Sequence, residues 1–518
     1  MQNTIFEYGD YENMHTATAQ VCIIGSGCGG ATLGKKLSDA GIDVLIVEQG
    51  GYYPSHKMDQ NELNMAGKLF GDRGLGASHD GGNMLVYGNN VGGASVHYWA
   101  DSYRTPTEKL ELWANKYGIS NHSENDLQAA FSEIEKNLHI HEATDEYFNP
   151  INSLLKKTTE QLTWKGHRVP QARKHCQKSG HCMQGCLYDA KQSQTVTHIP
   201  SMLEQGGRLF ADVKATKLNK SGDEISSLDL LVMDRKTNKP SNKKITVHAK
   251  VFVVAAGGFS SSYFLMQQDF AHTLPALGKY FSMNPSTIVH GLFEEDMMQW
   301  RNIPAAWGID EFRLRRFRDG QYQEGGYLLM PNQMHPGTLA ASLAPVGTEL
   351  EYWMSRFPKI AGSISWIDDV ETELGEIKIK SDGSREVYYP YGELTQLVLK
   401  DSIKKQAILL FQAGAKKLVV AGHVPLILDS VHQISKIDTM AIEAGGLFLA
   451  SPHPGGGCRM GNRKEDSVVD STHKVHDIDN LYVSDSSVFP TSSSLDPSLT
   501  IMAFSHVAAS FILKQLAV

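Results

Sequence analysis

The stretch that decides the fold is AQVCIIGSGCGGATLGKKLSDAGIDVLIVE, residues 19–48. The run AQVCII is apolar and rich in branched side chains, which is typical of a buried strand, and the turn GSGCGG follows it. The next segment, ATLGKKLSDAG, has apolar residues at helical spacing and ends in glycine, which predicts a helix. A second apolar run, IDVLIVE, predicts another buried strand. This order predicts a βαβ unit with parallel strands.

Three glycines in the turn, Gly25, Gly27 and Gly30, form the pattern GxGxxG. Gly25 permits the tight turn, Gly27 lets the backbone approach a pyrophosphate, and Gly30 lets the helix pack close to the sheet. The free N–H groups and the dipole at the start of the helix favour a bound anion. Glu48 ends the second strand, where a carboxylate accepts hydrogen bonds from ribose hydroxyls. We therefore predict a dinucleotide site, although this motif alone does not separate FAD from NAD.

Length and composition limit the classes of protein that are possible. The chain has 518 residues, 41% hydrophobic and 20% charged, which is ordinary globular composition and predicts two or three domains, or two domains interwoven in sequence. The net charge of -8 gives no sign of the basic surface that binds nucleic acids, so we expect no nucleic-acid partner. No apolar run reaches the ~20 residues of a membrane span. The N-terminus is acidic and polar and lacks the features of a secretory signal, so we expect a cytoplasmic protein.

Later segments continue the alternation of strands and helices. Residues 250–268, KVFVVAAGGFSSSYFLMQQ, predict a buried strand that leads into a helix. Residues 106–199 have a polar, helical pattern. Within 286–440, the segment EIKIKSDGSREVYYPY at 376–391 predicts a hairpin with a DG turn, and the region as a whole suggests an antiparallel sheet. Residues 441–518 return to short strands and glycine-rich loops and end in an apolar helix.

Three further segments identify the cofactor through a family resemblance. They are GNNVGGASVHYWADSYRTP at 88–106, VFVVAAGGFSSSYFLM at 251–266, and SPHPGGGCRMG at 451–461 with NLYVSDSSVFPTSSSLDPSLTIMA at 480–503. Together with the first motif, in this order and spacing, they resemble the glucose–methanol–choline (GMC) family of FAD-dependent oxidoreductases. The resemblance covers about half of the chain. Residues 286–440 match the family only in outline, and this is the region that would select the substrate.

The resemblance implies an α/β fold with a discontinuous, Rossmann-like FAD-binding domain and a substrate domain built on an antiparallel sheet with helices. We predict the FAD-binding domain at 1–105, 200–285 and 441–518, and the substrate domain at 106–199 and 286–440, with a Cys-rich loop at 175–193. The resemblance also implies contacts with FAD by Gly92, Gly93 and Ser95 in the flavin loop, Val213 near the adenine, Ala256 and Gly257 on the second face of the nucleotide pocket, and Asp485 near the ribityl or pyrophosphate group.

The catalytic base is predicted at His453, which lies in the glycine-rich loop SPHPGGGCRMG and matches the catalytic histidine of the family. Alcohol oxidation by a flavin needs a base for the hydroxyl proton while the hydride leaves the carbon, and imidazole titrates near neutral pH. The family has Asn or His in a later N-P-x-x-T segment, but this chain has Asp496 before Pro497. An ionised Asp can only accept hydrogen bonds. Asp496 could accept one from the substrate hydroxyl, pair with His453 and favour its protonated form, or only cap a turn.

His97 lies five residues after Gly92 in VGGASVHYW. In several family members a histidine at this place is bonded covalently to the flavin, and in others it is not. Two interpretations follow from the resemblance: a covalent bond from His97 to FAD, or packing of its ring against the dimethylbenzene edge of the flavin.

Cys176, Cys182 and Cys186 have the spacing C-x5-C-x3-C. Thiolates grouped on one loop are what an iron–sulfur cluster needs, and some family members hold a 3Fe-4S cluster on a similar group, whereas others have a similar Cys-rich stretch and no known cluster. We therefore consider a 3Fe-4S cluster on these three residues, a zinc site completed by His175 or His181, and free thiols in a packed loop.

The leading functional prediction is oxidation of a small-molecule alcohol to an aldehyde or ketone, with the electron acceptor (oxygen, a quinone or a partner protein) left open. A flavin enzyme that uses NAD(P)H would need a second GxGxxG loop, and AAGGFSS at 255–261 lacks that pattern. A flavin-bound electron-transfer subunit is a third possibility, supported only by Asp496. Aromatic and Met residues in the substrate region fit an apolar or ring substrate but are more often core residues: Trp300, Trp307, Tyr327, Met330, Met334, Trp353, Met354 and Trp366.

Overall fold

The structure is a computed structural model that describes the chain except residues 1–3, 238, 344, 423, 443–445 and 518. The predicted βαβ unit is present: β2 (Thr16–Ile24), α1 (Cys28–Asp39) and β3 (Val44–Val47). The two strands are parallel and in register from Val21 opposite Val44 to Ile24 opposite Val47. All four residues of β3 are buried, as the apolar run in the sequence requires.

This unit belongs to an eight-stranded sheet with the order β1-β8-β3-β2-β11-β10-β9, in which β23 also pairs with β11. Strands β1, β8, β3, β2, β11 and β23 pair in parallel, whereas β9, β10 and β11 form an antiparallel extension. The strands of this sheet beyond the βαβ unit are β1 (Ile5–Phe6), β8 (Arg208–Phe210), β9 (Val213–Ser221), β10 (Glu224–Asp234), β11 (Lys239–Val254) and β23 (Leu481–Val483).

A second, seven-stranded sheet has the order β21-β20-β12-β17-β16-β13-β6, and each neighbouring pair of its strands is antiparallel. The fold is therefore α/β, with a mainly parallel sheet and a separate antiparallel one, as predicted. The strands of the second sheet are β6 (Gly166–Arg168), β12 (Ile288–Leu292), β13 (Trp307–Ile309), β16 (Tyr327–Pro331), β17 (Ile360–Ile367), β20 (Lys417–Val420) and β21 (Leu426–Leu428).

Side chains alternate between the two faces of β17, so each face has its own core. Ala361 and Ile367 pack in one core with α5 (Pro150–Gln161) and α10 (Glu393–Gln412). Ile364 and Trp366 pack on the other face with α8 (Pro336–Leu343) and α9 (Gly347–Met354). This second face is the one that borders the cavity described below.

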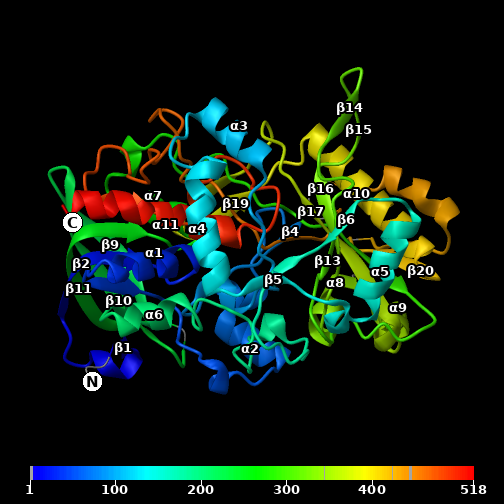
Figure 1. Ribbon diagram of the computed structural model, residues 1–518, viewed down its shortest axis with the longest axis horizontal. Helices are drawn as coiled ribbons and strands as arrows, with labels where there is room; N and C mark the ends of the chain where they lie inside the picture. Colours follow the sequence, from blue (N-terminus) through cyan, green and yellow to red (C-terminus); the bar gives the residue numbers. More distant parts are fainter. Residues whose placement is uncertain (1–3, 238, 344, 423, 443–445, 518) are drawn as a thin grey trace.

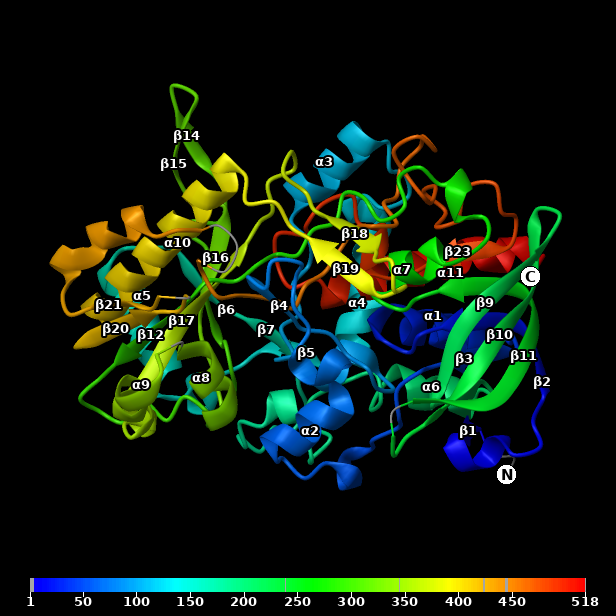
Figure 2. The same ribbon diagram turned by 180° about the vertical axis from the view of Figure 1, so that it is seen from behind.

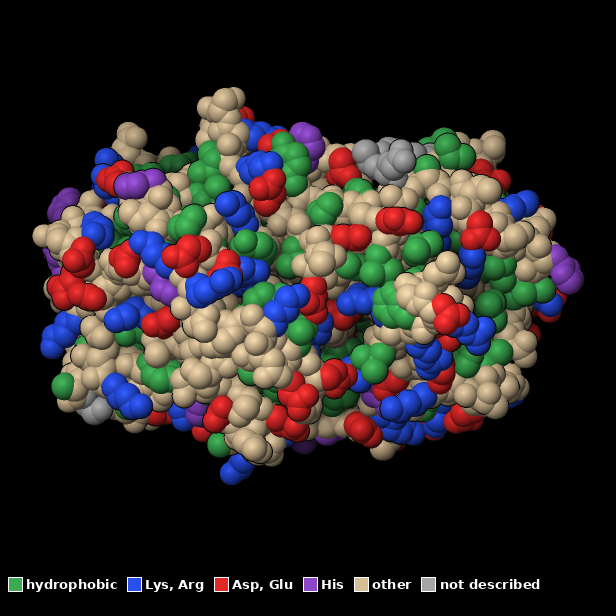
Figure 3. Space-filling model, turned by 90° about the horizontal axis from the view of Figure 1, so that it is seen from above, with side chains coloured by type: hydrophobic (Ala, Val, Ile, Leu, Met, Phe, Trp, Pro, Cys, Tyr) green, Lys and Arg blue, Asp and Glu red, His purple; other side chains and the backbone are tan. Residues whose placement is uncertain are grey.

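The two sheets occupy opposite ends of an elongated molecule, and both chain termini lie at the end that holds the parallel sheet (Figure 1). The C-terminal helix α11 (Ser498–Gln515) packs against α1 and against α4 (Glu124–Asn137). On the face drawn in Figure 3, positive and negative side chains are interspersed. Within the residues that the structure describes, no helix has both the length and the apolar character needed to cross a membrane.

Two segments of the predicted substrate domain pack partly on the nucleotide half. Within 106–199, α3 (Thr107–Tyr117) and α4 contribute to the core that contains α11. By contrast, β6 is a strand of the antiparallel sheet, and α5 packs in one of the cores of that sheet. The predicted hairpin forms β18 (Glu376–Ile379) and β19 (Arg385–Tyr388), which lie against α7 (Ser261–Met266) (Figure 2). The domain boundaries themselves stay a prediction.

Candidate active site

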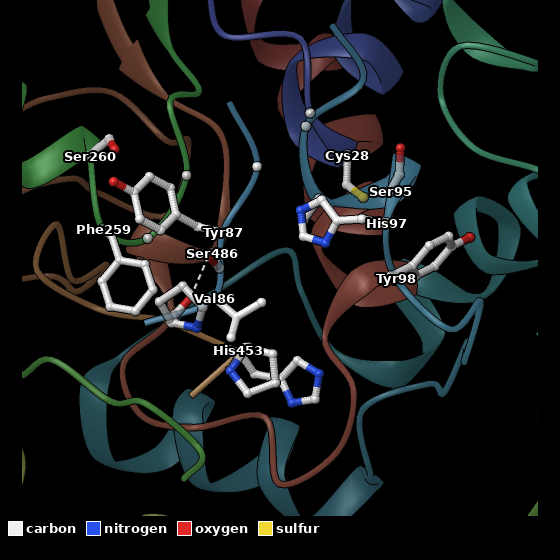
Figure 4. A pocket seen from close by; sticks show the side chains of 18 of the residues that line it. Cys28, Val86, Tyr87, Ser95, His97, Tyr98, Phe259, Ser260, His453 and Ser486 are labelled. Atoms are coloured by element: carbon white, nitrogen blue, oxygen red, sulfur yellow. Dashed lines mark hydrogen bonds between the residues drawn. The ribbon is translucent and has the colours of Figure 1, made fainter. Parts of the chain in front are cut away.

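A cavity of about 640 Å³ lies between the two sheets and is lined by residues from both. Figure 4 shows Ser95, His97 and Tyr98 on one side of it, Tyr87 and Phe259 opposite, and His453 at one end. Of the residues predicted from the sequence, those that border this cavity are Gly25, Gly27, Glu48, Gly93, Ser95, His97, Val213, Ala256, Gly257, His453, Asp485 and Asp496.

The glycines of the nucleotide turn differ in what surrounds them. A Cβ on Gly25, whose φ is +105°, would lie 2.2 Å from the carbonyl oxygen of Ala255, and one on Gly30 would lie 2.0 Å from the oxygen of Gly25. A Cβ on Gly27 would meet nothing closer than Gly93 Cα at 3.9 Å. Gly27 is the N-cap residue of α1 and borders the cavity, so the space in front of it is free for a ligand at the helix N-terminus. Gly25 and Gly30 therefore shape the turn, whereas Gly27 keeps it open.

Two carboxylates fix the loops around this turn. Glu48 accepts hydrogen bonds from the N–H (3.1 Å) and Oγ–H (2.8 Å) of Ser26 and from the N–H of Gly50 (2.9 Å). Burial raises the pKa of Glu48, and these hydrogen bonds oppose the rise. Asp485 accepts hydrogen bonds from the N–H of Gly257 (2.8 Å) and the Oγ–H of Ser261 (2.5 Å). Outside the cavity lining, the Gly92 N–H donates to Ser26 Oγ at 3.0 Å, which joins the flavin loop to the nucleotide turn.

His97 is buried and uncharged. Its ring stacks on Phe70 with a centroid distance of 4.0 Å. Burial and the positive charge of Lys191 lower the pKa of His97 to about 3. Lys191 donates from Nζ to the carbonyls of Val96 (2.6 Å) and Tyr98 (3.1 Å), the two neighbours of His97. The Nε2 atom of His97 has no hydrogen-bond partner among the described residues. A neutral imidazole with a free nitrogen at the cavity wall fits both interpretations of this residue.

The structure brings His453 and Asp496 together. His453 follows β22 (Leu449–Ser451), and Asp496 precedes α11. Nε2 of His453 lies 3.1 Å from Oδ1 of Asp496, and Nδ1 lies 2.7 Å from Oδ1 of Asn284. The ring of Trp366 covers His453 at a centroid distance of 4.7 Å. Of the three interpretations of Asp496 from the sequence, this geometry favours the pair with His453.

The hydrogen bonds around His453 determine where its protons lie. Asn284 donates from Nδ2 to the carbonyl of Ile367 at 2.5 Å, which leaves its Oδ1 as an acceptor for the Nδ1–H of His453. If His453 were neutral with its one proton on Nδ1, and Asp496 were ionised, lone pairs would face each other between Nε2 and Oδ1. The 3.1 Å contact therefore holds a proton, either on the imidazole or on the carboxyl.

Two residues of this site had no prediction from the sequence. Asp101 borders the cavity, is 2% exposed, and accepts a hydrogen bond from Gln171 Nε2 at 2.6 Å. An acid only four residues after His97, inside the flavin-loop motif, is a signal that could have identified it. Asn284 offers no such signal, because it contacts His453 across 169 residues of sequence.

The cysteine cluster lies in a separate small pocket. Cys176, Cys182 and Cys186 line it together with the buried cations Arg173 and Lys191. Each sulfur accepts one N–H at 3.4 Å, from the Lys178 amide, the Arg173 guanidinium and the Lys191 amide respectively. In the described part of the chain, no group of three or more His, Cys, Asp or Glu side chains is placed to hold a metal ion. The arrangement does not support the iron–sulfur or the zinc interpretation, and the cluster stays a prediction for experiment.

Only part of the aromatic and Met set from the sequence borders the cavity. Met334 and Trp366 line it. Trp307, Tyr327, Met330 and Trp353 are buried in the cores of the antiparallel sheet and are absent from the cavity lining.

Comparison with known proteins identifies the family. Two family models described as GMC oxidoreductase match residues 45–286 and 403–505, together more than half of the chain. An uncharacterised GMC-type oxidoreductase of Mycobacterium tuberculosis is 25% identical over 95% of this chain and 75% of its own. A long-chain-alcohol oxidase of Arabidopsis thaliana is 23% identical over 98% of this chain and 69% of its own, and a cholesterol oxidase of Acinetobacter baumannii is 23% identical over 95% and 93%.

Among solved structures, pyridoxine 4-oxidase from Mesorbium loti has the same fold, with a TM-score of 0.70, 14% identity, and coverage of 95% of this chain and 98% of that chain. The order of motifs along the chain, the two sheets and the family matches agree. The chain belongs to the GMC oxidoreductase family, whose members bind FAD.

Proposed function

We propose that this chain oxidises an alcohol to an aldehyde or ketone, with FAD accepting the hydride from the carbon that bears the hydroxyl. The observation that carries this proposal is the pair of His453 and Asp496 at the wall of the cavity that Gly27 and Glu48 also border. Relatives named as long-chain-alcohol oxidases support an alcohol as the substrate.

The residues around the cavity fit a bound FAD. The free space in front of Gly27 and the N-terminus of α1 suit a pyrophosphate. Each oxygen of Glu48 has two acceptor sites, and its three hydrogen bonds from the protein leave one for a ribose hydroxyl. Val213 and Ala256 border the cavity. Ala256 lies two residues after the carboxyl end of β11, which is where a nucleotide would bind in a Rossmann-like sheet.

We infer that the base predicted at His453 is the His453–Asp496 pair acting as one unit. The contact between Nε2 and Oδ1 holds one proton, so the pair carries no net charge and can accept a second proton from the substrate hydroxyl. Asn284 fixes the imidazole through Nδ1, and the ring of Trp366 packs against it. The proton of an alcohol has a pKa far above neutral, so its transfer to the pair must accompany departure of the hydride.

Anaerobic mixing of the FAD-loaded enzyme with a panel of primary, secondary and sugar alcohols tests the proposal. We expect at least one class to bleach the absorbance of the oxidised flavin, and reoxidation with air or a quinone then distinguishes an oxidase from a dehydrogenase. Full flavin loading without bleaching by any alcohol would contradict the proposal and favour an electron-transfer subunit.

A further inference from the structure

Two carboxyl oxygens at the base of the active site have no hydrogen-bond donor. They are Oδ2 of Asp101 and Oδ2 of Asp496, and both are fully enclosed among the described residues. A buried carboxylate oxygen without a donor is strongly unfavourable, so each of these atoms requires an explanation.

The two carboxyls belong to segments that run side by side. Ser498 donates from Oγ to the carbonyl of Asp101 at 3.0 Å, and Thr500 Oγ1 accepts the N–H of Thr105 at 3.1 Å. These hydrogen bonds join residues 101–105 to the start of α11, directly after Asp496. Burial and the charge of Asp496 raise the pKa of Asp101 well above its ordinary value.

We propose that Asp101 is a positioning residue that stays protonated and donates its carboxyl hydrogen to Asp496, so that the two carboxyls share one proton beside His453. The effect of Asp101 on catalysis rests on the proposed function, whereas the position of the proton does not. Asp101 Oδ1 accepts from Gln171 Nε2 (2.6 Å). In the proposed arrangement Asp101 Oδ2–H donates to Asp496 Oδ2, and these are the two oxygens that have no other donor. Asp496 Oδ1 then accepts from His453 Nε2–H. One added proton thus satisfies both unpaired oxygens.

This arrangement fixes the charges of the site. Asp496 is the ionised member, held by one donor on each oxygen, and His453 is the cation that balances it. Other groups that act on Asp101 are Arg173, which donates to the Oε1 of Gln171 at 3.0 Å, and the Cys182 thiol. The charge of Asp101 also acts on Tyr98 and Tyr103, and burial keeps the pKa values of both tyrosines far above ten, so both stay neutral. Asp101 therefore keeps Asp496 oriented toward His453 without adding a second negative charge.

Asp101→Asn is the decisive variant, because an amide reproduces the protonated carboxyl. Its Oδ1 can accept from Gln171 and its Nδ2–H can donate to Asp496. We expect flavin reduction by an alcohol within a few-fold of wild type. Asp101→Ala removes the donor to a charged acceptor and should lower the rate on the order of 10- to 100-fold. The wild-type enzyme should also lose activity at alkaline pH, where Asp101 ionises against Asp496, and Asp101→Asn should lack that loss.

Asp369→Asn is a matched control. Oδ1 of Asp369 already accepts from the N–H of Met283 and the hydroxyl of Tyr389, and Oδ2 accepts from the N–H of Asn284. An Asn at position 369 would place its NH2 group against an N–H or O–H that now donates to the carboxylate. We therefore expect Asp369→Asn to be destabilised and Asp101→Asn not to be. The comparison shows whether Asn is accepted at position 101 because it replaces a protonated carboxyl, or whether buried Asp residues of this protein can be replaced by Asn in general.

Infrared spectroscopy of the FAD-loaded enzyme tests the proton without any substrate. We expect a carboxylic-acid carbonyl band at neutral pH that disappears in Asp101→Asn. The absence of that band in wild type, or a rate in Asp101→Asn as low as in Asp101→Ala, would overturn the proposal. If the band is present but no alcohol bleaches the flavin, the proton assignment stands and the proposed function fails.

Discussion

Nε2 of His453 lies 3.1 Å from Oδ1 of Asp496, at the position where the family resemblance implies Asn or His. Asn offers a donor and an acceptor, whereas an ionised Asp only accepts. Asp496, when ionised, can therefore pair with His453 only as an acceptor.

Asp496→Asn should change the pH profile of flavin reduction. In the proposed mechanism the base is the His453–Asp496 pair, and an amide at position 496 cannot share the proton that lies between Nε2 and Oδ1. Stopped-flow reduction rates across pH, for wild type and variant, measure the change. An unmoved profile would mean that Asp496 only caps a turn.

His453→Ala should slow flavin reduction by ~100- to 10,000-fold, the usual contribution of general-base catalysis. The corresponding increase in barrier is about 3–5.5 kcal/mol. The FAD spectrum should stay intact, because the contacts that fix the nucleotide turn involve Ser26, Glu48 and Gly50 instead. Reduction at the wild-type rate would refute the assignment of the active site.

The sequence was sufficient for the elements whose patterns are local. The βαβ unit and the hairpin at 376–391 follow from residues close together in the chain, and both are present. The division of 106–199 between two cores was not predictable, because the faces that α3 and α4 bury become defined only when α11 packs beside them. Asn284 was missed for the same reason, because its role depends on a contact with His453 that only the fold creates.

Gly27→Val should give a folded protein with little or no FAD. A Cβ at Gly27 meets only Gly93 Cα at 3.9 Å, so the protein itself tolerates the side chain, but the valine would occupy the space predicted for the pyrophosphate. Gly30→Val is the control, because its Cβ would lie 2.0 Å from a backbone oxygen and should prevent folding. Flavin absorbance per chain and circular dichroism distinguish the two. A fully yellow Gly27→Val would show that the cofactor site is elsewhere.

The thiols of Cys176, Cys182 and Cys186 should be free. Each accepts a single N–H, and the described residues do not assemble a metal site around them. We expect Cys182→Ser to keep FAD and the rate of flavin reduction. Iron and acid-labile sulfide analysis of anaerobically prepared protein, with low-temperature EPR, is the direct test. Stoichiometric iron and sulfide that disappear in Cys182→Ser would instead support the iron–sulfur prediction and a dehydrogenase.

His97 should carry a covalently attached flavin. Burial and the charge of Lys191 lower its pKa to about 3, so the ring is a neutral nucleophile throughout the physiological range, and its Nε2 has no partner among the described residues. Acid precipitation of the purified protein should leave the yellow colour in the pellet. His97→Asn removes the nucleophile but keeps a polar side chain, and its flavin should be released to the supernatant. A colourless wild-type pellet with a yellow supernatant would show instead that His97 only packs against the ring edge.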